Sequence, residues 1–371
     1  MTWRRSAQER CSALEEAGLL RSITDFDALG PRGRLPDGRR VVSFASNDYL
    51  GLSCHPAVMA AARNAIERWG SGAGAARLVV GARPVHSELE AEIARWKATE
   101  RALLFPTGYA ANLGVLTALA RPGTLICSDE LNHASIVDGC SAAKAHVAVY
   151  PHRDPAALEH LLCGARNAIV VTDAVFSMDG DSAPIEDIAE VCARHEALLV
   201  LDEAHALLSE EPDLQGVEVL RVGTLSKFLG SAGGFVAGPG PLIELLLNRA
   251  RSGIFTTALS PADAAAALCA LRIVRADEGE QLKERLRSLV GRFRPGHSSP
   301  IVPLVLGDER RALEASHALL EGGFLVPAIR PPSVPAGTAR LRVTLSAAHA
   351  EDEVDGLRRA VASLEPLAAR A

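Results

Sequence analysis

The sequence predicts an α/β fold with two parts, a large domain on a mostly parallel sheet and a smaller α+β C-terminal domain. Two observations lead to this prediction. Between about residues 100 and 240, short apolar runs alternate with helical stretches, which is typical of a parallel sheet covered by helices. Beyond about residue 260, an Ala- and Leu-rich helix is followed by three more short apolar runs. We therefore expect an N-terminal arm with a helix at 1–45, a large domain at 46–255 and a small domain at 256–371.

The segment before the large domain is rich in turn-forming residues. Residues 30–40 read GPRGRLPDGRR, and this density of Gly and Pro predicts a loop and a boundary. Apolar side chains then recur at helical spacing over 55–69, which predicts an amphipathic helix.

The expected strands are runs of four to six residues that are apolar on both faces, as in strands buried on both sides of a sheet. In the large domain they are 102–105, 124–127, 146–150, 168–173, 197–202, 219–224 and 235–238. In the small domain they are 301–306, 324–328 and 341–345. A final helix is expected from the helical spacing of Val354, Leu357, Val361 and Leu364.

Composition excludes several classes of protein. The 39 basic and 45 acidic residues give a net charge of −6, without a polybasic run, which argues against nucleic acid or an anionic membrane as partner. No apolar run reaches the roughly 18 residues of a membrane span, and the N-terminus has no apolar signal core. The seven cysteines occur singly, which favours reduced thiols in a cytoplasm. His133, His195 and His205 show no metal-ligand spacing, so no metal is expected.

Asp202 and Lys227 point most directly to a cofactor. Asp202 ends the run 197–202, and Lys227 follows the run 219–224. Ligands of open α/β sheets bind at the carboxyl ends of strands. There a carboxylate can keep a ring nitrogen protonated and a lysine can form a Schiff base, the two groups that pyridoxal phosphate needs. Taken alone, Lys227 could also be a surface lysine in a Gly-rich loop.

Residues 202–205 (DEAH) also match a helicase-type box. An NTPase of that kind needs a GxxxxGK[ST] loop upstream, and the sequence contains none. We therefore discard the NTPase interpretation.

Three further strand-end loops carry polar groups. Gly108 opens a helix after the run 102–105, where backbone N–H groups can bind a phosphate. His133 follows the next strand and could stack on a cofactor ring, and Ser177 follows the strand that ends at Asp173. Individually these are an ordinary turn, a capping or solvated histidine and a loop serine. Their convergence on one rim of the sheet favours a binding site.

Six segments together give a specific resemblance. They are SNDYLGL (46–52), TGYAAN (107–112), NHAS (132–135), FSMDGD (176–181), LDEAH (201–205) and GTLSK (223–227). In this order they resemble the α-oxoamine synthases, which are pyridoxal-phosphate-dependent acyltransferases of the aspartate-aminotransferase fold (fold type I). Residues 328–342 (AIRPPSVPAGTARLR) resemble the member of this family that condenses L-alanine with a pimeloyl thioester, carried by coenzyme A or an acyl-carrier protein, in biotin biosynthesis.

The resemblance implies a role for each matched cofactor residue. Lys227 would be the Schiff-base lysine, Asp202 would pair with the pyridine nitrogen, and His133 would stack on the ring. His205 and Ser177 would lie near the phenolic oxygen of the cofactor. The residues implied at the phosphate are Gly108, Tyr109 and Thr224, with Thr256 and Thr257 reaching the phosphate of the other subunit of a homodimer.

The resemblance also implies substrate-binding residues. Arg342 would hold the carboxylate of the amino acid, and His133 would also face the substrate. The positions implied near the acyl group are Arg21, Asn47, Arg330 and Ser333. Lys227, His133, Asp202 and His205 form the implied catalytic set.

The sequence departs from the family pattern in two segments. Residues 206–213 (ALLSEEPD) replace a longer Gly-containing loop, and residues 72–77 (GAGAAR) replace the usual GxGGSR. Neither change removes an implied cofactor residue, but both bear on the acyl carrier. Two other functions remain open at this stage. One is a related synthase that uses glycine or serine, and the other is a non-catalytic protein that keeps the cofactor-binding fold.

Overall fold

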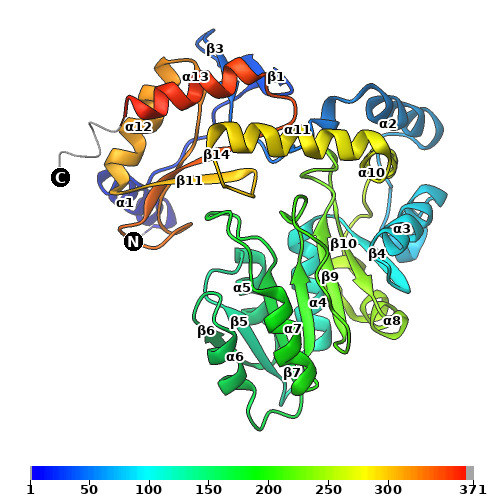
Figure 1. Cartoon of the computed structure of the whole chain (residues 1–371). Coiled ribbons are helices and arrows are strands. Elements are labelled where there is room, and N and C mark those ends of the chain that lie inside the picture. Colours follow the sequence, from blue (N-terminus) through cyan, green and yellow to red (C-terminus); the bar gives the residue numbers. More distant parts are fainter. Residues whose placement is uncertain (1, 365–371) are drawn as a thin grey trace. The chain divides into compact units, whose positions relative to one another are not determined.

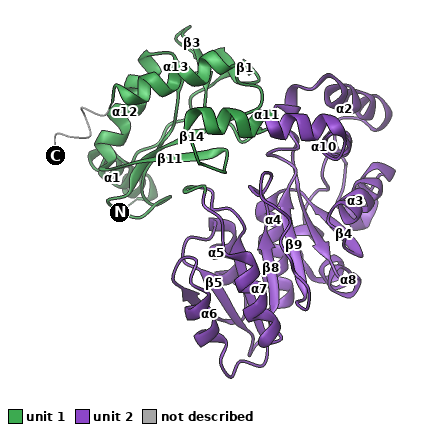
Figure 2. Cartoon of the chain, viewed as in Figure 1, with its two compact units in different colours: residues 1–49, 178–180, 285–371 green, residues 50–177, 181–284 purple. Residues whose placement is uncertain are grey.

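The computed structural model describes residues 2–364, and the chain in it divides into two compact units (Figure 2). Unit 1 comprises residues 1–49, 178–180 and 285–371, and unit 2 comprises residues 50–177 and 181–284. Helix α11 (Asp277–Phe293) therefore begins in unit 2 and ends in unit 1.

A seven-stranded sheet forms the centre of unit 2 (Figure 1). Its order is β4 (Arg101–Phe105), β10 (Gly234–Gly238), β9 (Val219–Thr224), β8 (Leu198–Asp202), β7 (Ala168–Asp173), β5 (Leu125–Asp129) and β6 (His146–Tyr150). All neighbouring strands from β9 to β6 are parallel, whereas β10 is antiparallel to both β4 and β9. The predicted mostly parallel sheet is confirmed.

Helices cover both faces of this sheet, because successive residues of a buried strand enter two different apolar clusters. Ile126 and Val200 belong to one cluster, and their neighbours Cys127 and Leu199 belong to the other. The first cluster contains side chains of α4 (Gly108–Leu119), α5 (Ala134–Ala142) and α8 (Gly240–Arg249). The second contains side chains of α6 (Pro155–Leu162) and α7 (Ile185–Arg194).

The other helices of unit 2 are α2 (Pro56–Trp69), α3 (Pro84–Trp96), α9 (Arg251–Ile254) and α10 (Pro261–Val274), with the short turns η1 (Leu52–Cys54) and η2 (Arg77–Gly81). Polar caps define where several helices begin. Thr107 accepts a hydrogen bond from Ala110 N–H at the start of α4, and Ser260 does the same for Asp263 N–H at the start of α10.

Unit 1 contains two small sheets. In one, β11 (Ile301–Gly307), β14 (Ala339–Thr344) and β13 (Ala328–Ile329) pair antiparallel. In the other, β1 (Asp27–Leu29), β2 (Arg32–Arg34) and β3 (Arg40–Ser43) form an antiparallel meander, and β12 (Phe324–Leu325) joins β3 in parallel. The helices of this unit are α1 (Trp3–Glu16), α12 (Glu309–Glu321), α13 (Glu351–Ala362) and the second part of α11.

Several sequence-based expectations differ from the structure in detail. The predicted loop at 30–40 is wrong, because β2 and β3 pair there and only residues 35–39 form the turn. The predicted strand at 324–328 is two short strands, β12 and β13, which enter different sheets. The final helix ends at Ala362, so Leu364 lies beyond it.

The boundaries of the two compact units also differ from the predicted domain ranges. Helix α10 packs against α2 and α3 and therefore belongs to unit 2, and residues 1–49 belong with the C-terminal segment in unit 1. The domain ranges 1–45, 46–255 and 256–371 stay a prediction. Among residues 2–364, no helix is both long and apolar enough to cross a membrane.

Candidate functional site

Carboxylates end three neighbouring parallel strands of unit 2. They are Asp129 on β5, Asp173 on β7 and Asp202 on β8, and all three are buried. Asp173 and Asp202 are direct partners in the register of β7 and β8. A buried carboxylate is costly unless hydrogen bonds replace its lost hydration, so the donors around these groups define the site.

Asn112 and a backbone amide hold Asp202. The Asn112 Nδ2 group donates to Asp202 Oδ2 at 2.7 Å, and Ala204 N–H donates to Asp202 Oδ1 at 2.9 Å. Asn112 lies in α4 with only 1% of its surface exposed. The strand end therefore presents a carboxylate whose position is fixed from two sides.

The same amide of Asn112 connects Asp202 to His133. Asn112 Nδ2 also donates to Ser135 Oγ at 2.9 Å, and Ser135 Oγ lies 2.8 Å from His133 Nδ1. His133 Nδ1 in addition accepts Ser135 N–H at 3.2 Å, because His133 is the N-cap of α5. With Nδ1 acting as an acceptor, the neutral ring carries its proton on Nε2.

Burial and nearby charges set the protonation of this cluster. Burial lowers the pKa of His133 from its ordinary value, Asp202 opposes that shift and Lys227 adds to it. Burial and the neighbouring Asp202 raise the pKa of Asp173 well above its ordinary value. Asp173 accepts the His133 N–H at 2.7 Å, so it also fixes the turn that carries His133.

Lys227 lies beside His205. The Lys227 Nζ atom is 2.8 Å from His205 Nε2, and the two residues come from the loops after β9 and β8. The Lys227 loop is held by short backbone hydrogen bonds, among them Gly230 N–H to Lys227 O at 2.9 Å. Gly230 has φ of +60°, and a Cβ atom there would be 2.2 Å from Ser53 N, so only glycine fits this turn.

The start of α4 and the end of β9 form a small polar cradle. A Cβ atom on Gly108 would be 3.3 Å from Thr224 Cβ, so the two backbones approach closely. Thr224 Oγ1 lies 2.7 Å from Ser226 Oγ and donates to Gly233 O at 3.0 Å. The first N–H groups of α4 are donors suited to a phosphate, and the hydroxyls of Thr224 and Ser226 line the same cradle.

This donor set fits pyridoxal phosphate. Asp202 supplies a fixed carboxylate for a ring N–H, Lys227 supplies an amine, and the cradle of Gly108 and Thr224 supplies phosphate donors. Within residues 2–364, no group of three or more His, Cys, Asp or Glu side chains is arranged to hold a metal ion.

Four of the predicted cofactor residues lie at the edge of this cluster or outside it. The Tyr109 hydroxyl donates to Asp138, and its ring is half exposed. Thr256 and Thr257 follow α9 beside Phe255, whose ring is 70% exposed, and their side chains make no hydrogen bond to the described part of the chain. Ser177 is half-buried in the loop after β7.

Apart from His133, which lies in unit 2, the predicted substrate residues belong to unit 1 and form separate contacts there. Arg342 is buried on β14 and donates to Asn47 Oδ1 at 3.1 Å and to Thr344 Oγ1 at 3.0 Å. Burial lowers the pKa of its guanidinium, and Tyr49 opposes that shift. Unit 1 thus holds a cation enclosed by polar neighbours.

The other substrate residues of unit 1 lie nearer its surface. Arg21 donates to Ser333 Oγ at 3.3 Å, and Arg330 donates to the carbonyl oxygen of Gly18. The structure therefore brings Arg21 together with Ser333, and Asn47 together with Arg342.

Sequence reasoning did not assign roles to Asn112, Ser135 or Asp173. Asn112 and Ser135 stand inside the quoted motifs TGYAAN and NHAS, and Asp173 ends a predicted strand. A functional role for Asn112, Ser135 and Asp173 could have been suspected because each is a polar residue inside an otherwise apolar segment. What the sequence could not supply was the pairing of Asn112 with Asp202, which are 90 residues apart.

Comparison with known proteins gives one family throughout. The family model for aminotransferase class I and II matches residues 39–361. An 8-amino-7-oxononanoate synthase of Methylobacterium nodulans is 47% identical over 96% of both chains. An 8-amino-7-oxononanoate synthase of Methylococcus capsulatus is 49% identical over 89% of this chain and 90% of its own.

Solved structures agree with this family. A serine palmitoyltransferase of S. paucimobilis with bound PLP and myriocin is 28% identical, with a TM-score of 0.90 over 98% of this chain and 97% of its own. An 8-amino-7-oxononanoate synthase of Francisella tularensis is 24% identical, with a TM-score of 0.74 over 88% of this chain and 98% of its own, and supports the fold alone. The predicted fold class is confirmed.

Proposed function

The chain belongs to the aminotransferase class I and II family, among the 8-amino-7-oxononanoate synthases, and we propose that it condenses L-alanine with a pimeloyl thioester. The products are 8-amino-7-oxononanoate, carbon dioxide and the free thiol, a step of biotin biosynthesis. The observation that carries the proposal is the cluster of unit 2, where Lys227 Nζ lies 2.8 Å from His205 Nε2 and Asn112 holds the buried Asp202.

Pyridoxal phosphate, when bound, supplies the electron sink that stabilises the carbanion formed at the amino-acid Cα. In this assignment Asp202 would accept the ring N–H, and Asn112 and Ala204 N–H would keep its two oxygens in place. The first turn of α4 and Thr224 would bind the phosphate.

Lys227 would hold the cofactor before the amino acid arrives and would then move the α-proton at Nζ. His205 Nε2 is close enough to accept a hydrogen bond from Nζ and orient it. His133 would cover the ring, and its Nε2–H would be free to donate to the thioester carbonyl, since Nδ1 is engaged by Ser135.

In unit 1, Arg342 is the candidate for the alanine carboxylate because guanidinium groups bind carboxylates with two hydrogen bonds. Its burial between Asn47 and Thr344 fixes its orientation. Arg21, Arg330 and Ser333 would serve the acyl chain, with its terminal carboxylate as a partner for one arginine.

We also propose a homodimer that places Thr256 and Thr257 near the phosphate of the partner subunit. An exposed apolar surface of unit 2 supports this, with Val79 at 72% and Phe255 at 70% exposure. Sedimentation of the wild-type protein and of a Val79→Asp variant tests it, since a charge in a buried apolar interface favours the monomer.

The seven free cysteines support a cytoplasmic location.

A product assay with an amino-acid panel tests the proposed reaction. Holoenzyme is incubated with pimeloyl-CoA and L-alanine, glycine or L-serine, and the product is identified by mass spectrometry. We expect product with L-alanine and none with Lys227→Ala, which should keep its fold and some cofactor binding. Product with glycine or serine alone would show a related synthase, and normal turnover by Lys227→Ala would refute the assignment of the lysine.

A further inference from the structure

Four arginines lie on the hairpin of β2 and β3 in unit 1, and two of them have carboxylate partners. Arg32 forms two hydrogen bonds with Glu353, at 2.6 and 2.7 Å. Arg39 pairs with Asp37 at 2.6 Å and with Glu321 at 2.7 Å. The charges of these two arginines are balanced within the unit.

The other two arginines, Arg34 and Arg40, are directly opposite each other in the register of β2 and β3. Both are exposed, and neither makes an ion pair or side-chain hydrogen bond with the described part of the chain. Like charges directly opposite on an antiparallel pair destabilise the sheet. The hairpin therefore keeps an unfavourable pair of cations that a bound anion would stabilise.

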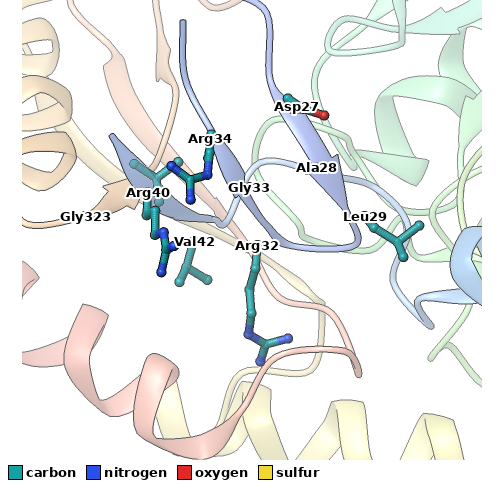
Figure 3. Close-up of a pocket in the computed structure, with 10 residues that line it drawn as sticks. Asp27, Ala28, Leu29, Arg32, Gly33, Arg34, Arg40, Val42 and Gly323 are labelled. Atoms are coloured by element: carbon teal, nitrogen blue, oxygen red, sulfur yellow. The ribbon is translucent and has the colours of Figure 1, made fainter. Parts of the chain in front are cut away.

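A cavity of about 700 Å³ is formed at this pair, which is within the range of small-ligand sites. Figure 3 shows the Arg34 and Arg40 guanidinium groups on the same side of the hairpin. Asp27 is the single acidic residue of the lining and faces Arg34 in the register of β1 and β2, but no ion pair joins them. In Figure 3 its carboxylate points away from both guanidinium groups.

We propose that Arg34 and Arg40 bind a phosphate group. A guanidinium group is a rigid fork of N–H donors that matches phosphate oxygens. A phosphate dianion balances two cations and offers enough oxygens for both forks, whereas one carboxylate balances a single cation. The cavity beside the pair leaves room for the rest of the ligand.

Two sources of such a phosphate are distinguishable. One is coenzyme A, whose diphosphate and 3′-phosphate would enter the cavity, and this source depends on the proposed function. The other is a free phosphate compound that binds independently of the reaction. The recognition chemistry is the same for both.

Binding measurements on the holoenzyme test the proposal. Calorimetry with coenzyme A, inorganic pyrophosphate and pantetheine is compared for the wild-type protein, Arg34→Gln, Arg40→Gln and the double variant. The protein is saturated with pyridoxal phosphate so that the phosphate cradle of unit 2 is occupied. Arg310→Gln is the matched control, since Arg310 is an exposed arginine on α12 of the same unit with no described partner.

We expect each single variant to weaken coenzyme A binding by about tenfold, as for the loss of one charge-assisted contact. The double variant should lose more, Arg310→Gln should stay within about twofold, and pantetheine should bind equally to all. Pyrophosphate binding that falls in parallel would support the pair with a free phosphate source. Unchanged binding of both phosphate probes in the double variant, or no binding of either to the wild type, would overturn the proposal.

Failure of this proposal is separable from failure of the proposed function. Product formation from L-alanine and a pimeloyl thioester is measured without reference to the hairpin. Pyrophosphate binding to Arg34 and Arg40 is measured without reference to turnover.

Discussion

Replacing Asn112 with leucine removes the amide that joins Asp202 to Ser135. Leucine is similar in size, and the Asn112 Oδ1 atom has no hydrogen-bond partner in the structure, so its loss costs little. The bond to the Asp202 carboxylate is of the charged kind, worth about 1.5–3 kcal/mol, and the bond to Ser135 is worth about 0.5–1.5 kcal/mol. We expect Asn112→Leu to lower the free energy of unfolding by about 2–4.5 kcal/mol.

Ser135→Ala is the matched variant because it removes the hydrogen bonds of the Ser135 hydroxyl to Asn112 and His133 and leaves the bond from Asn112 to Asp202 intact. Its expected loss is about 1–3 kcal/mol for two neutral hydrogen bonds. Both variants lose the bond between Asn112 and Ser135, so their difference compares the charged bond to Asp202 with the neutral bond to His133.

Urea unfolding of the apoprotein, followed by tryptophan fluorescence, measures both losses. Trp96 reports on unit 2, since its ring packs against Phe228 at 5.9 Å and Phe235 at 6.1 Å. Trp3 is 92% exposed and should change little on unfolding. Midpoints are compared at equal slope, because a changed slope would mean a changed unfolded or intermediate state. Equal midpoint shifts for Asn112→Leu and Ser135→Ala would refute the reasoning.

Three other variants test separate parts of the structure. The hydrogen bonds of His152 to two carboxylates outweigh the effect of burial and raise its pKa. The destabilisation by His152→Gln should therefore be largest below about pH 6.5 and should fade at higher pH. Unfolding measured as a function of pH tests this, and a destabilisation that grows with pH would contradict it. Gly230→Ala should inactivate the enzyme by displacing the backbone of Ser53 beside it. Gly216→Ala, which is also at positive φ but has open space around it, should cost about 1–2 kcal/mol of stability and keep activity. Equal activity of the two variants would contradict the close approach of Gly230 to Ser53. Lys97→Met should cost about 1.5–3 kcal/mol, because it removes a 2.7 Å contact to the buried Glu203, which keeps Arg221 as its other partner. Arg101→Met removes a solvent-exposed ion pair and should barely move the denaturation midpoint. Similar midpoint shifts for the two variants would show that burial does not matter here.

The sequence predicted the architecture of unit 2 well because most of its strands are largely buried. Such strands are continuous apolar runs, and the predicted runs 168–173 and 219–224 have the observed bounds. The run 146–150 also has the observed bounds, although it forms the partly exposed edge strand β6. The position of Asp202 at a strand end followed from the same pattern. The antiparallel strand β10 was not foreseen as such, since an apolar run does not reveal its direction.

In unit 1 the strands β1 and β2 were predicted less well because they are short and largely exposed. Residues 32–34 read Arg-Gly-Arg, which carries no apolar signal, and the flanking glycines predict a loop. The strand forms because β3 supplies hydrogen-bond partners, and Val41 of β3 is buried. The composition of β2 alone could not show this.

At both candidate sites, the sequence does not show which distant residues become neighbours. Asn112 reaches Asp202 only because α4 lies over the strand end where β8 stops, and nothing in the motif TGYAAN names that partner. Arg34 and Arg40 become a pair of facing cations only because the turn of 35–39 sets them opposite each other; a slip of one residue would turn one of them to the other face of the sheet. Residue types thus indicate the chemistry of each site, while helix packing in unit 2 and strand register in unit 1 determine which side chains act on the same ligand.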